Sequence, residues 1–521
     1  MAKEDSGYGK PAGGGLMSGS VNTGFVLDMQ RKLYRWSYAD ADMVFADLFN
    51  LVCDRRTLDA AWQRLARNKG SQTPGTDGVT RSKVERRPGG ATRFLEDIRE
   101  ELRRGIYRPE PVRQRLIPKP GKPGRYRPLG IPTLKDRLVQ MALKLVLEPI
   151  FEADFAPTSY GFRRGRSTHD ALARIQKLLH STRHGPSPVS YVIEGDIKGC
   201  FDSIDHHVLM NCVRRRIGDR KVLRLVHAFL KAGIMIEGTV RHPVTGTPQG
   251  GIISPLLANV YLSAIDERYR RWTMASRERP QRAADRRFYD RGLGRPTFQV
   301  VRYADDFVIL VSGSKEEAEA ERDALAAFLK KELRMELAIE KTLITKVEDG
   351  FEFLGYQVRQ TRARRTGRLV GNLFIPKRKL QHLRDKIKAS TKRPSLIRPF
   401  TELIDDLNPV IMGWRNYYRY ATRACHEFGG LDWWLGYRIA RWLRKKHRKT
   451  PPRKLRQLYG PRGKSRWGDG TVRLRSFRTG GTSHYPDRGA RIPNGWNADP
   501  DEKFMPGAAN FWEAVNSLMT M

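Results

Sequence analysis

The sequence predicts an α+β fold, in which a sheet backed by helices is followed by a basic helical region. Up to about Ile375 the segments follow the order strand, helices, hairpin, helix, strand, which is typical of this class. Beyond that point the pattern changes to helices of high positive charge. The chain has 521 residues, whereas single cores stop growing at roughly 250 to 300 residues. We therefore expect two or three domains.

The charge balance indicates a polyanionic partner. The chain carries 97 Lys and Arg against 56 Asp and Glu, a formal net charge of +41, which exceeds what solubility requires. We expect nucleic acid and no membrane, since the richest apolar run, Met141 to Ile150, is interrupted by charges. The chain shows no secretory signal, and its four cysteines form no CxxC pair. These features favour a bacterial-type cytoplasm, with the protein held at the nucleoid by nucleic acid.

The first third of the chain is expected to be mainly helical. Residues 1–25 are rich in Gly and Ser, which predicts a disordered tail. A helical pattern follows from Ala46 to Leu65. The basic stretch from Tyr107 to Arg127 is interrupted by Pro and Gly, which predicts two strands joined by a turn. An amphipathic helix is predicted from Asp136 to Phe151.

The middle of the chain contains the predicted sheet. A short strand rich in β-branched residues ends at Asp196. Phe298–Tyr303 and Phe307–Ser312 are predicted to form a hairpin with Asp305 and Asp306 at its tip.

Three further segments complete this region. The polar residues 270–297 show no clear period and are expected to form an exposed insertion. A charged helix is predicted from Lys315 to Leu333. The stretch FEFLGYQVR, Phe351 to Arg359, is predicted to be one strand.

The acidic pair in this hairpin suggests chemistry. A pair of Asp residues in a turn is commonplace, because Asp favours turns. Adjacent carboxylates nevertheless repel each other, and divalent cations remove that cost. Asp196 could complete an oxygen-rich site of the kind that Mg²⁺ prefers when substrate phosphates supply the other ligands. Two such ions can activate a 3′ hydroxyl and stabilise pyrophosphate as it leaves, which predicts nucleotidyl transfer. The alternative for Asp196 is a helix N-cap. Asp202, Asp205 and Asp266 are interpreted as caps or surface acids.

Nine segments, in chain order, resemble the group II intron reverse transcriptases and maturases. They are NKGSQTPGTDGV, IPKPGKPGRYRPLGIPTLKDRLVQ, SYGFRRGRSTHDAL, DIKGCFD, GTPQGGIISPLLANVYL, RYADDFVIL, EKT, FLGY and LNPVIMGWRNYYRY. One departure is Arg164, which stands where the family pattern has proline. The resemblance implies a right-hand polymerase with fingers, a palm with an antiparallel sheet, and a thumb, followed by a helical maturase region called domain X.

The resemblance also implies a division of the chain. The expected parts are a disordered tail (1–25), fingers and palm (26–375), the start of the thumb (376–400), thumb and basic domain X (401–480) and a C-terminal tail (481–521). Many relatives end in an HNH endonuclease domain with cysteine pairs. We expect none here, so that mobility would require another primer source, such as a nascent strand at a replication fork.

By the resemblance, Asp196, Asp305 and Asp306 are the palm carboxylates that hold two Mg²⁺ ions, with Mn²⁺ as a possible substitute. Phe201 is the floor beneath the incoming sugar, where a flat ring excludes a 2′ hydroxyl. The alternative for Phe201 is ordinary core packing beside Ile204.

Four further residues are expected to contact the nucleotide. Lys119 and Arg127 would hold the triphosphate, although both could instead belong to a solvated basic hairpin. Gln249 would contact the nascent base pair or support the template strand. Lys341 would approach the phosphates, with a helix-end cation as the alternative.

The carboxyl-terminal third is expected to bind RNA. Between Arg441 and Gly480 there are 15 Lys or Arg and a single acid, Asp469. A charge run is usually a solvated face, but solubility does not require this density. The residues expected to contact phosphates are Arg415, Arg419, Arg423, Arg441, Arg444, Lys445 and Lys446. Trp414 and at least one nearby tyrosine are interpreted as packing residues.

The expected function is that of an RNA-directed DNA polymerase that also binds intron RNA and assists its splicing and mobility. The expected partners are intron RNA, an RNA template with a DNA primer, dNTPs and target DNA. One alternative is a non-enzymatic splicing factor, which the intact carboxylates disfavour. Another is a reverse transcriptase freed from its intron and used in repair or defence, which the domain X resemblance disfavours.

Overall fold

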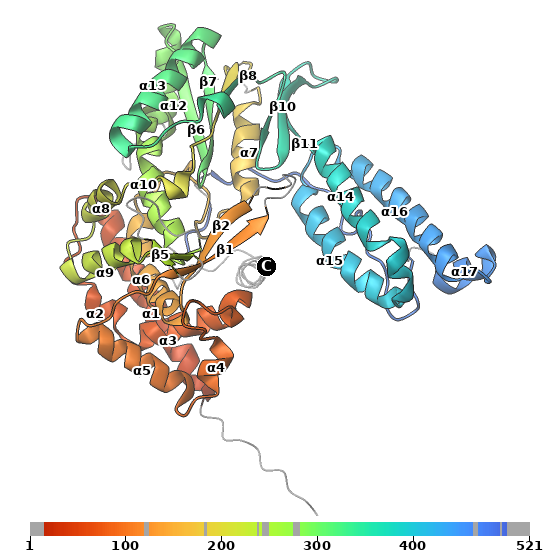
Figure 1. Ribbon diagram of the computed structural model, residues 1–521. Coiled ribbons are helices and arrows are strands. Elements are labelled where there is room, and N and C mark those ends of the chain that lie inside the picture. The colour runs from red at the N-terminus through yellow and green to blue at the C-terminus, as the bar shows by residue number, and fades with distance from the viewer. Residues whose placement is uncertain are drawn as a thin grey trace, which may run out of the picture.

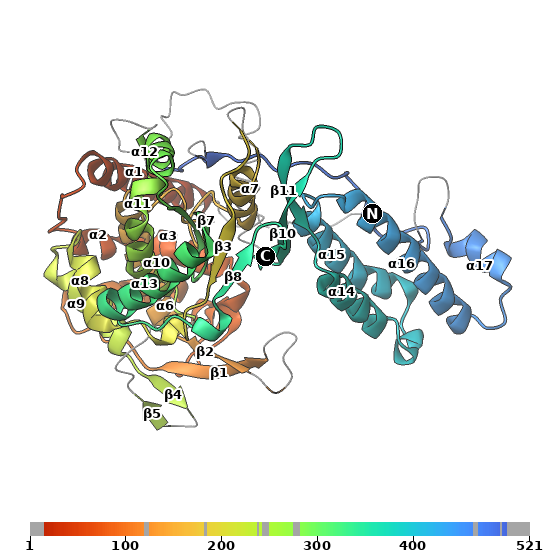
Figure 2. The same ribbon diagram turned by 90° about the horizontal axis from the view of Figure 1, so that it is seen from above.

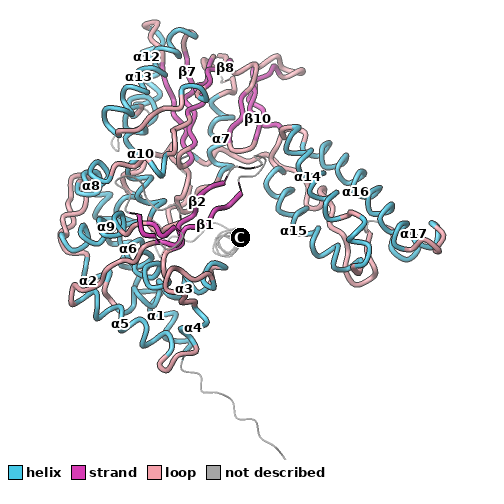
Figure 3. The backbone as a smooth tube through the Cα atoms, in the orientation of Figure 1, coloured by secondary structure: helices cyan, strands magenta, loops and turns pink. Residues whose placement is uncertain are grey.

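The computed structural model describes residues 15–118, 124, 126–181, 185–236, 239–241, 250–274, 282–461, 467–489 and 492–496. These residues form a large body of helices and strands, with a helical arm extending to one side (Figures 1 and 2). The strands all precede the arm in sequence and lie within the body or at its junction with the arm (Figure 3). Among the described helices, none combines the length and the apolar character that crossing a membrane would require.

The helices of the body surround the sheets, and the last four α-helices form the arm. Their bounds are α1 (Gly15–Ala39), α2 (Phe49–Val52), α3 (Arg55–Ala66), α4 (Arg81–Glu85), α5 (Gly90–Arg103), α6 (Leu134–Glu152), α7 (Thr168–Leu178), α8 (His206–Arg214), α9 (Arg220–Lys231), α10 (Ser254–Arg268), α11 (Arg270–Thr273), α12 (Arg282–Gly292), α13 (Lys315–Leu333), α14 (Lys377–Ser390), α15 (Phe400–Tyr418), α16 (Ala424–Lys446) and α17 (Pro452–Tyr459). Short 3₁₀ turns are η1 (Lys69–Gln72), η2 (Cys200–Asp202), η3 (Ile339–Lys341) and η4 (Arg393–Ile397).

Within the described part of the chain the strands form three sheets, with orders β6-β7-β3-β8, β2-β1-β4-β5 and β11-β10-β9. Their bounds are β1 (Val112–Pro118), β2 (Tyr126–Ile131), β3 (Tyr191–Gly195), β4 (Ile234–Ile236), β5 (Thr239–Arg241), β6 (Thr297–Tyr303), β7 (Asp306–Ser312), β8 (Leu343–Lys346), β9 (Phe351–Phe353), β10 (Tyr356–Arg362) and β11 (Leu369–Phe374). The hairpin and the short central strand predicted from the sequence therefore belong to one antiparallel sheet.

This central sheet separates two hydrophobic cores. Along β7, Phe307, Ile309 and Val311 pack into the core of the helical body, whereas Val308 and Leu310 pack into the core shared with the arm. Successive side chains of a strand point to opposite faces, so a sheet covered on both faces needs apolar residues at every position. The strand therefore reads as a continuous apolar run, and only its end can carry charges.

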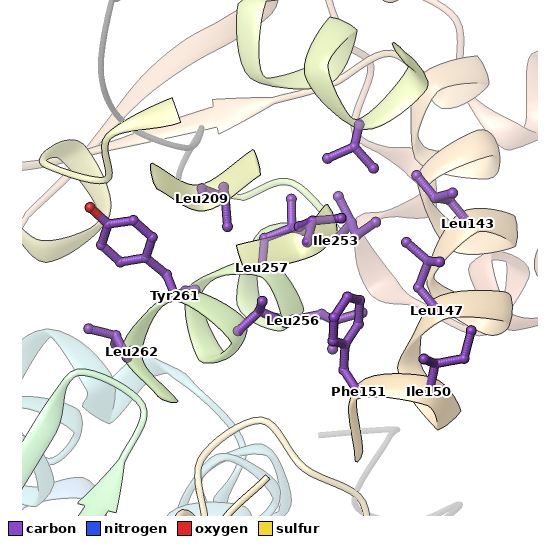
Figure 4. Close-up of a cluster of buried hydrophobic side chains, with 14 of the residues drawn as sticks. Leu143, Leu147, Ile150, Phe151, Leu209, Ile253, Leu256, Leu257, Tyr261 and Leu262 are labelled. Carbon is purple, nitrogen blue, oxygen red and sulfur yellow. The ribbon is translucent and has the colours of Figure 1, made fainter. Parts of the chain in front are cut away.

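Helices α6 and α10 form much of the core beneath the sheet (Figure 4). Leu143 and Leu147 of α6 face Leu256 and Leu257 of α10, with Leu209 of α8 nearby. Each of these side chains is at most 4% exposed. This packing gives the site a rigid support.

The prediction of a disordered tail over residues 1–25 is partly wrong, because α1 begins within it. The helix begins at Gly15, inside the segment expected to be disordered, while residues 1–14 lie outside the described part of the chain. The physical reason is the burial of Val26, Met29 and Leu33 in the body core. Because helix formation is cooperative, a docked apolar face can extend a helix into a segment of poor intrinsic propensity.

Two further predictions were wrong in detail. Residues 270–297 contain α11 and α12 rather than only an exposed insertion, because the buried Asp290 accepts hydrogen bonds from Arg271 and Trp272. The predicted strand from Phe351 to Arg359 is a hairpin of β9 and β10, since Leu354 and Gly355 both adopt positive φ and reverse the chain.

The described part of the C-terminal tail packs back onto the body. Tyr485 and Arg488 hydrogen-bond to Asp170 of α7. Trp496 is 1% exposed, and its indole N–H donates to Gln30 of α1. The segment 497–521 lies outside the described residues. The tail thus connects the arm to the first helix of the chain.

Candidate active site

The acidic pair lies at a tight hairpin tip. Tyr303 pairs with Asp306 across β6 and β7, which leaves Ala304 and Asp305 as the turn. Ala304 has a φ of 59°, a left-handed backbone conformation that residues other than glycine rarely adopt. Gly161 supports this turn closely, since a Cβ there would lie 2.2 Å from the Ala304 nitrogen. The tip is therefore held in one conformation by its surroundings.

A buried arginine fixes the same turn from beneath. Arg302 is fully buried and donates to the Ala304 carbonyl at 3.0 Å. Its guanidinium also contacts Asp266 at 2.5 Å and the Asn259 side-chain oxygen at 3.0 Å. Asn259 in turn donates to the carbonyl of Gly161. Asp266 is consequently a buried partner of this arginine and not the cap or surface acid that the sequence suggested.

Strand pairing brings Asp196 to the hairpin tip. Gly195 pairs with Phe307 in the β3–β7 ladder, so Asp196 follows at the edge where Asp306 begins β7. A Cβ at position 195 would lie 2.1 Å from the Phe307 ring, which explains the glycine before the acid. The three predicted carboxylates therefore gather at one edge of the sheet.

The charges at this edge interact. Burial raises the pKa of Asp305, and burial with the charges of Asp305 and Asp196 raises the pKa of Asp306 to about 6. Arg127 lowers both pKa values. Lys341 lies 2.9 Å from the Asp196 carboxylate as its counter-ion. Within the described chain, no group of three or more His, Cys, Asp or Glu side chains has the arrangement of a complete metal site.

The N-cap alternative for Asp196 is wrong. The turn that follows, η2, begins after Gly199, whose φ is 52°. Asp205 does cap a helix, because its side chain accepts from the Val208 N–H at the start of α8. Phe201 packs partly against the body core, and the rest of its ring is exposed.

The structure places only some of the predicted nucleotide contacts. Arg127 is exposed on β2, and its positive charge acts to lower the pKa of both acids of the hairpin tip. Lys119 and Gln249 lie outside the described residues. Next to the latter, Gly250 packs against β2, where a Cβ would lie 2.3 Å from the Gly130 carbonyl oxygen.

The residues of the arm that were predicted to contact RNA fall into two groups, which differ in exposure. Arg423, Arg441, Arg444 and Lys445 are exposed, and Arg419 is half-buried. The other two, Arg415 and Lys446, donate to backbone carbonyls of the protein.

The prediction that Arg415 and Lys446 contact RNA phosphates does not fit the structure, because both side chains are bound within the protein. Arg415 is 4% exposed, because the chain at Gly480 and Gly481 covers its guanidinium. Lys446 donates to the carbonyls of Leu396 and Arg398 and therefore stabilises the end of η4.

The arm also carries an aromatic pair that sequence reasoning missed. Trp433 and Tyr437 of α16 are 76% and 61% exposed. Their rings are nearly parallel, at 11°, with centroids 6.3 Å apart. Arg441 follows at the same spacing of four residues, on the same helix face. The signal was this spacing of two aromatic residues and a cation.

Arg164, the departure from the family pattern, has a structural partner. Its guanidinium lies over the Trp496 ring, 5.0 Å from the centroid, and 3.5 Å from Glu148. The extra charge thus helps to hold the tail against the body.

Two family models match the chain. Residues 117–358 match "Reverse transcriptase (RNA-dependent DNA polymerase)". Residues 380–460 match "Group II intron, maturase-specific domain". The first range contains the central sheet with its carboxylates, and the second covers most of the arm.

Curated relatives give the same indication. The chain is 32% identical over 501 residues to the group II intron-encoded protein LtrA of Lactococcus lactis subsp. cremoris, with 83% of this chain and 80% of LtrA covered. It is 38% identical over 348 residues to protein YkfC of Escherichia coli strain K12, with 65% of this chain and 90% of YkfC covered. A chain from a solved "Partial Cas6-RT-Cas1--Cas2 complex" matches 55% of this chain and 43% of its own length, at 22% identity and a TM-score of 0.30.

Proposed function

The chain belongs to the group II intron-encoded reverse transcriptases, and we propose that Asp196, Asp305 and Asp306 are the carboxylates with which it catalyses nucleotidyl transfer. Membership makes it an RNA-directed DNA polymerase with a maturase domain, serving intron splicing and mobility. The observation that supports the three residues most is the β3–β7 register, which brings Asp196 beside the hairpin tip.

Reverse transcriptases generally use divalent metal ions, and this donor set suits them. A raised pKa means that Asp306 ionises at a cost in the absence of a cation, and a cation removes that cost. Carboxylate oxygens are also the ligands that Mg²⁺ prefers in proteins. We assign the site to two Mg²⁺ ions, with Mn²⁺ as a substitute. When bound, such ions activate a 3′ hydroxyl and stabilise the pyrophosphate leaving group.

The neighbouring cations are assigned to the triphosphate of a dNTP. Arg127 already offsets the negative charge of the acidic pair, and its guanidinium can contact phosphate oxygens through two parallel N–H groups. Lys341 neutralises Asp196 and becomes available to phosphates once that carboxylate has another counter-ion. Lys119 and Gln249 are included on the family motif alone. Phe201 is proposed as the floor beneath the sugar.

The parts of a right-hand polymerase are assigned accordingly. We place the palm at the central sheet, the fingers at the helices and strands before it, and the thumb and domain X at α14–α17. The exposed cations of the arm, Arg423, Arg441, Arg444 and Lys445, would then contact phosphates of the intron RNA, with Arg419 at their edge. Nucleic-acid binding itself follows from the two family domains.

Primer extension on an RNA template with dNTPs and Mg²⁺ tests the catalytic assignment. The test variant carries Asp305→Asn and Asp306→Asn, which keep the shape of the turn and remove both charges. We expect extension to fall below detection, while binding of the RNA that flanks the reading frame is retained. A matched control is Glu348→Gln with Asp349→Asn, an adjacent pair of exposed acids in the β8–β9 turn. It should extend primers as the wild type does.

Two outcomes would overturn the assignment. Extension by the Asp305/Asp306 variant at the wild-type rate would exclude these carboxylates as metal ligands. A folded wild type that binds RNA and extends no primer with Mg²⁺ or Mn²⁺ would leave a splicing factor without polymerase activity.

A further inference from the structure

A stripe of basic residues runs along the outer face of α9. Arg220, Arg224, His227 and Lys231 follow one another at intervals of four, three and four residues, which places them on one side of the helix. The opposite side is packed into the body core. At 1.5 Å per residue, the stripe from Arg220 to Lys231 is about 16 Å long. That length exceeds a single phosphate group and matches several consecutive ones.

Two open grooves border this stripe. One has a volume of about 840 Å³ and lies between α2, α5 and α9, where Arg103 and Lys221 join the stripe. The other has a volume of about 760 Å³ and lies between α8, α9 and the residue after α13, where Arg214 joins it. Arg224 lines both grooves, so that the basic surface is continuous from one to the other.

Four acids line these grooves: three of them cap helices, and the fourth, Asp47, is exposed and accepts from the Asn50 side chain. Asp219 accepts from the backbone N–H groups of Leu48, Phe49, Lys221 and Val222, and so caps α9 and holds the start of α2. Asp54 and Asp205 cap α3 and α8 in the same way. The negative charge of these three caps is therefore partly offset by backbone N–H groups, and that of Asp205 also by Arg334.

In the described part of the chain, four of the groove cations form no ion pair with an acid. Among the ion pairs of the described residues, none joins Arg103, Arg220, Lys221 or Arg224 to a carboxylate. Other positive charges of this surface affect His227, whose pKa is lowered by burial and then by the charges of Lys231, His206 and Arg214. An anion bound along the stripe would relieve this repulsion.

We propose that these joined grooves, the α9 groove, bind the sugar–phosphate backbone of a nucleic acid. Figures 1 and 2 both place α8 and α9 at the end of the body opposite the arm. None of the groove cations is among the residues assigned above to the active site or to the arm surface. The α9 groove would therefore hold a part of a long nucleic acid that is not the template being copied. This inference stands apart from the proposed catalytic residues.

The test uses the full chain carrying Arg220→Ala, Lys221→Ala and Arg224→Ala. The side chains are exposed, and the cap at Asp219 uses only backbone groups, so the fold should be retained. The probes are an RNA duplex of about 30 base pairs with blocked 3′ ends and a DNA duplex of the same sequence, each measured at several salt concentrations. One equivalent of a short unlabelled primer–template is present to occupy the active site without saturating the groove.

We expect binding of at least one duplex to weaken tenfold or more at about 0.15 M salt, and the slope of log Kd against log salt to fall by about 2 to 3. A matched control removes three cations of α13, by Lys315→Ala, Arg322→Ala and Lys330→Ala, and should change binding far less. Primer extension on a short template reports the fold of the groove variant and should stay at the wild-type rate.

Each outcome has one meaning. Weaker binding of RNA alone, of DNA alone or of both supports the proposal and identifies which backbone the groove takes. Unchanged affinity and slope for both duplexes, or a loss equal to that of the α13 control, would overturn it. If no form of the protein extends a primer, the catalytic assignment fails while the binding comparison still decides the α9 groove.

Discussion

Arg302 illustrates how one buried side chain can determine the geometry of a site. It is a full positive charge inside the body, and Asp266 is the acid that compensates it. Removing one partner of a buried ion pair leaves an uncompensated charge, at a typical cost of about 3 to 5 kcal/mol. We therefore expect Asp266→Ala to lower the free energy of unfolding by that amount. The free energy is obtained from the midpoint and the slope of urea denaturation. The double variant Asp266→Leu with Arg302→Met should lose less.

The control for this prediction is an exposed pair. Glu336 contacts Lys198 at 3.0 Å, and both side chains are more than half exposed. Glu336→Ala should change the free energy of unfolding by less than about 1 kcal/mol, because water screens such pairs. Equal losses in the Asp266 and Glu336 variants would show that the buried pair has no special role.

Asp306 gives a prediction about pH. Its pKa in the folded protein, about 6, lies above the ordinary value of 3.8, so the folded state holds the proton more tightly than the unfolded state. Ionisation at neutral pH therefore destabilises the folded state, and this penalty disappears as the pH falls from about 6 toward 4. In EDTA, Asp306→Asn should melt at a higher temperature than the wild type at pH 7.5. The gap corresponds to no more than about 1 kcal/mol, because Asp306 is exposed at the hairpin tip and its carboxylate is only partly desolvated.

The comparison at pH 5 checks the sign of this prediction. There the wild type is largely protonated at Asp306, so the melting temperatures of the two proteins should approach each other. A gap that widens toward acid pH would contradict it. Added Mg²⁺ should also narrow the gap at pH 7.5, by stabilising only the wild type.

The sequence predicted the acids of the site but not their supports. Asp305 and Asp306 interrupt an apolar run, which is visible in one dimension. Arg302 is buried and Arg441 is exposed, and this difference depends on how the surrounding elements pack. Arg415 shows the same limit, because its cover comes from Gly480 and Gly481, far along the chain. Tertiary packing, not local pattern, decides whether a cation can meet a ligand.

Helix α16 presents aromatic and basic side chains on one exposed face. Exposed parallel rings can stack with unpaired bases, and such stacking contributes about 1 to 3 kcal/mol per base. We expect Trp433→Ala with Tyr437→Ala to weaken binding of a single-stranded RNA about tenfold or more, without changing the salt slope. Arg441→Ala with Arg444→Ala should instead reduce the slope. Fluorescence anisotropy over a range of salt concentrations distinguishes the two effects.

An exposed aliphatic residue of the arm serves as the control for this pair. Ile397 is 90% exposed on η4. Ile397→Ala removes apolar surface without removing a ring, so RNA affinity should be unchanged. If it weakens binding as much as the aromatic variant does, general apolar contact rather than stacking is responsible.

Elements were predicted best where one pattern determines them. The hairpin of β6 and β7 and the helix α13 were predicted within a residue or so, since apolar runs and caps mark them. The turn at Leu354 and Gly355 was missed because a non-glycine residue in the left-handed region leaves little trace in the sequence. Helix α1 was not predicted, because its stability comes from docking against α6.

At the level of the whole molecule, the described part of the C-terminal tail is joined to the first helix of the body. The arm holds the tail through Asp432, which accepts from Ser476 and Phe477. The tail then reaches α7 at Arg488 and α1 at Trp496. Composition could not predict this path, because the tail is polar and its contacts are single residues separated by exposed chain.

Trp496 should therefore stabilise two distant segments at once. Its ring packs beside Tyr34 of α1, at 6.1 Å between centroids, and beneath Arg164. Truncating a buried Trp to Ala typically costs about 3 to 5 kcal/mol, here confined to the segments that it joins. We expect Trp496→Ala to speed amide hydrogen exchange in α1 and in residues 482–489, with α14 unchanged. The control Phe288→Ala removes a ring that is 76% exposed on α12 and should leave α1 unchanged. Faster exchange throughout the body would mean that Trp496 supports the entire core, whereas unchanged exchange in α1 would mean that the tail merely rests on it.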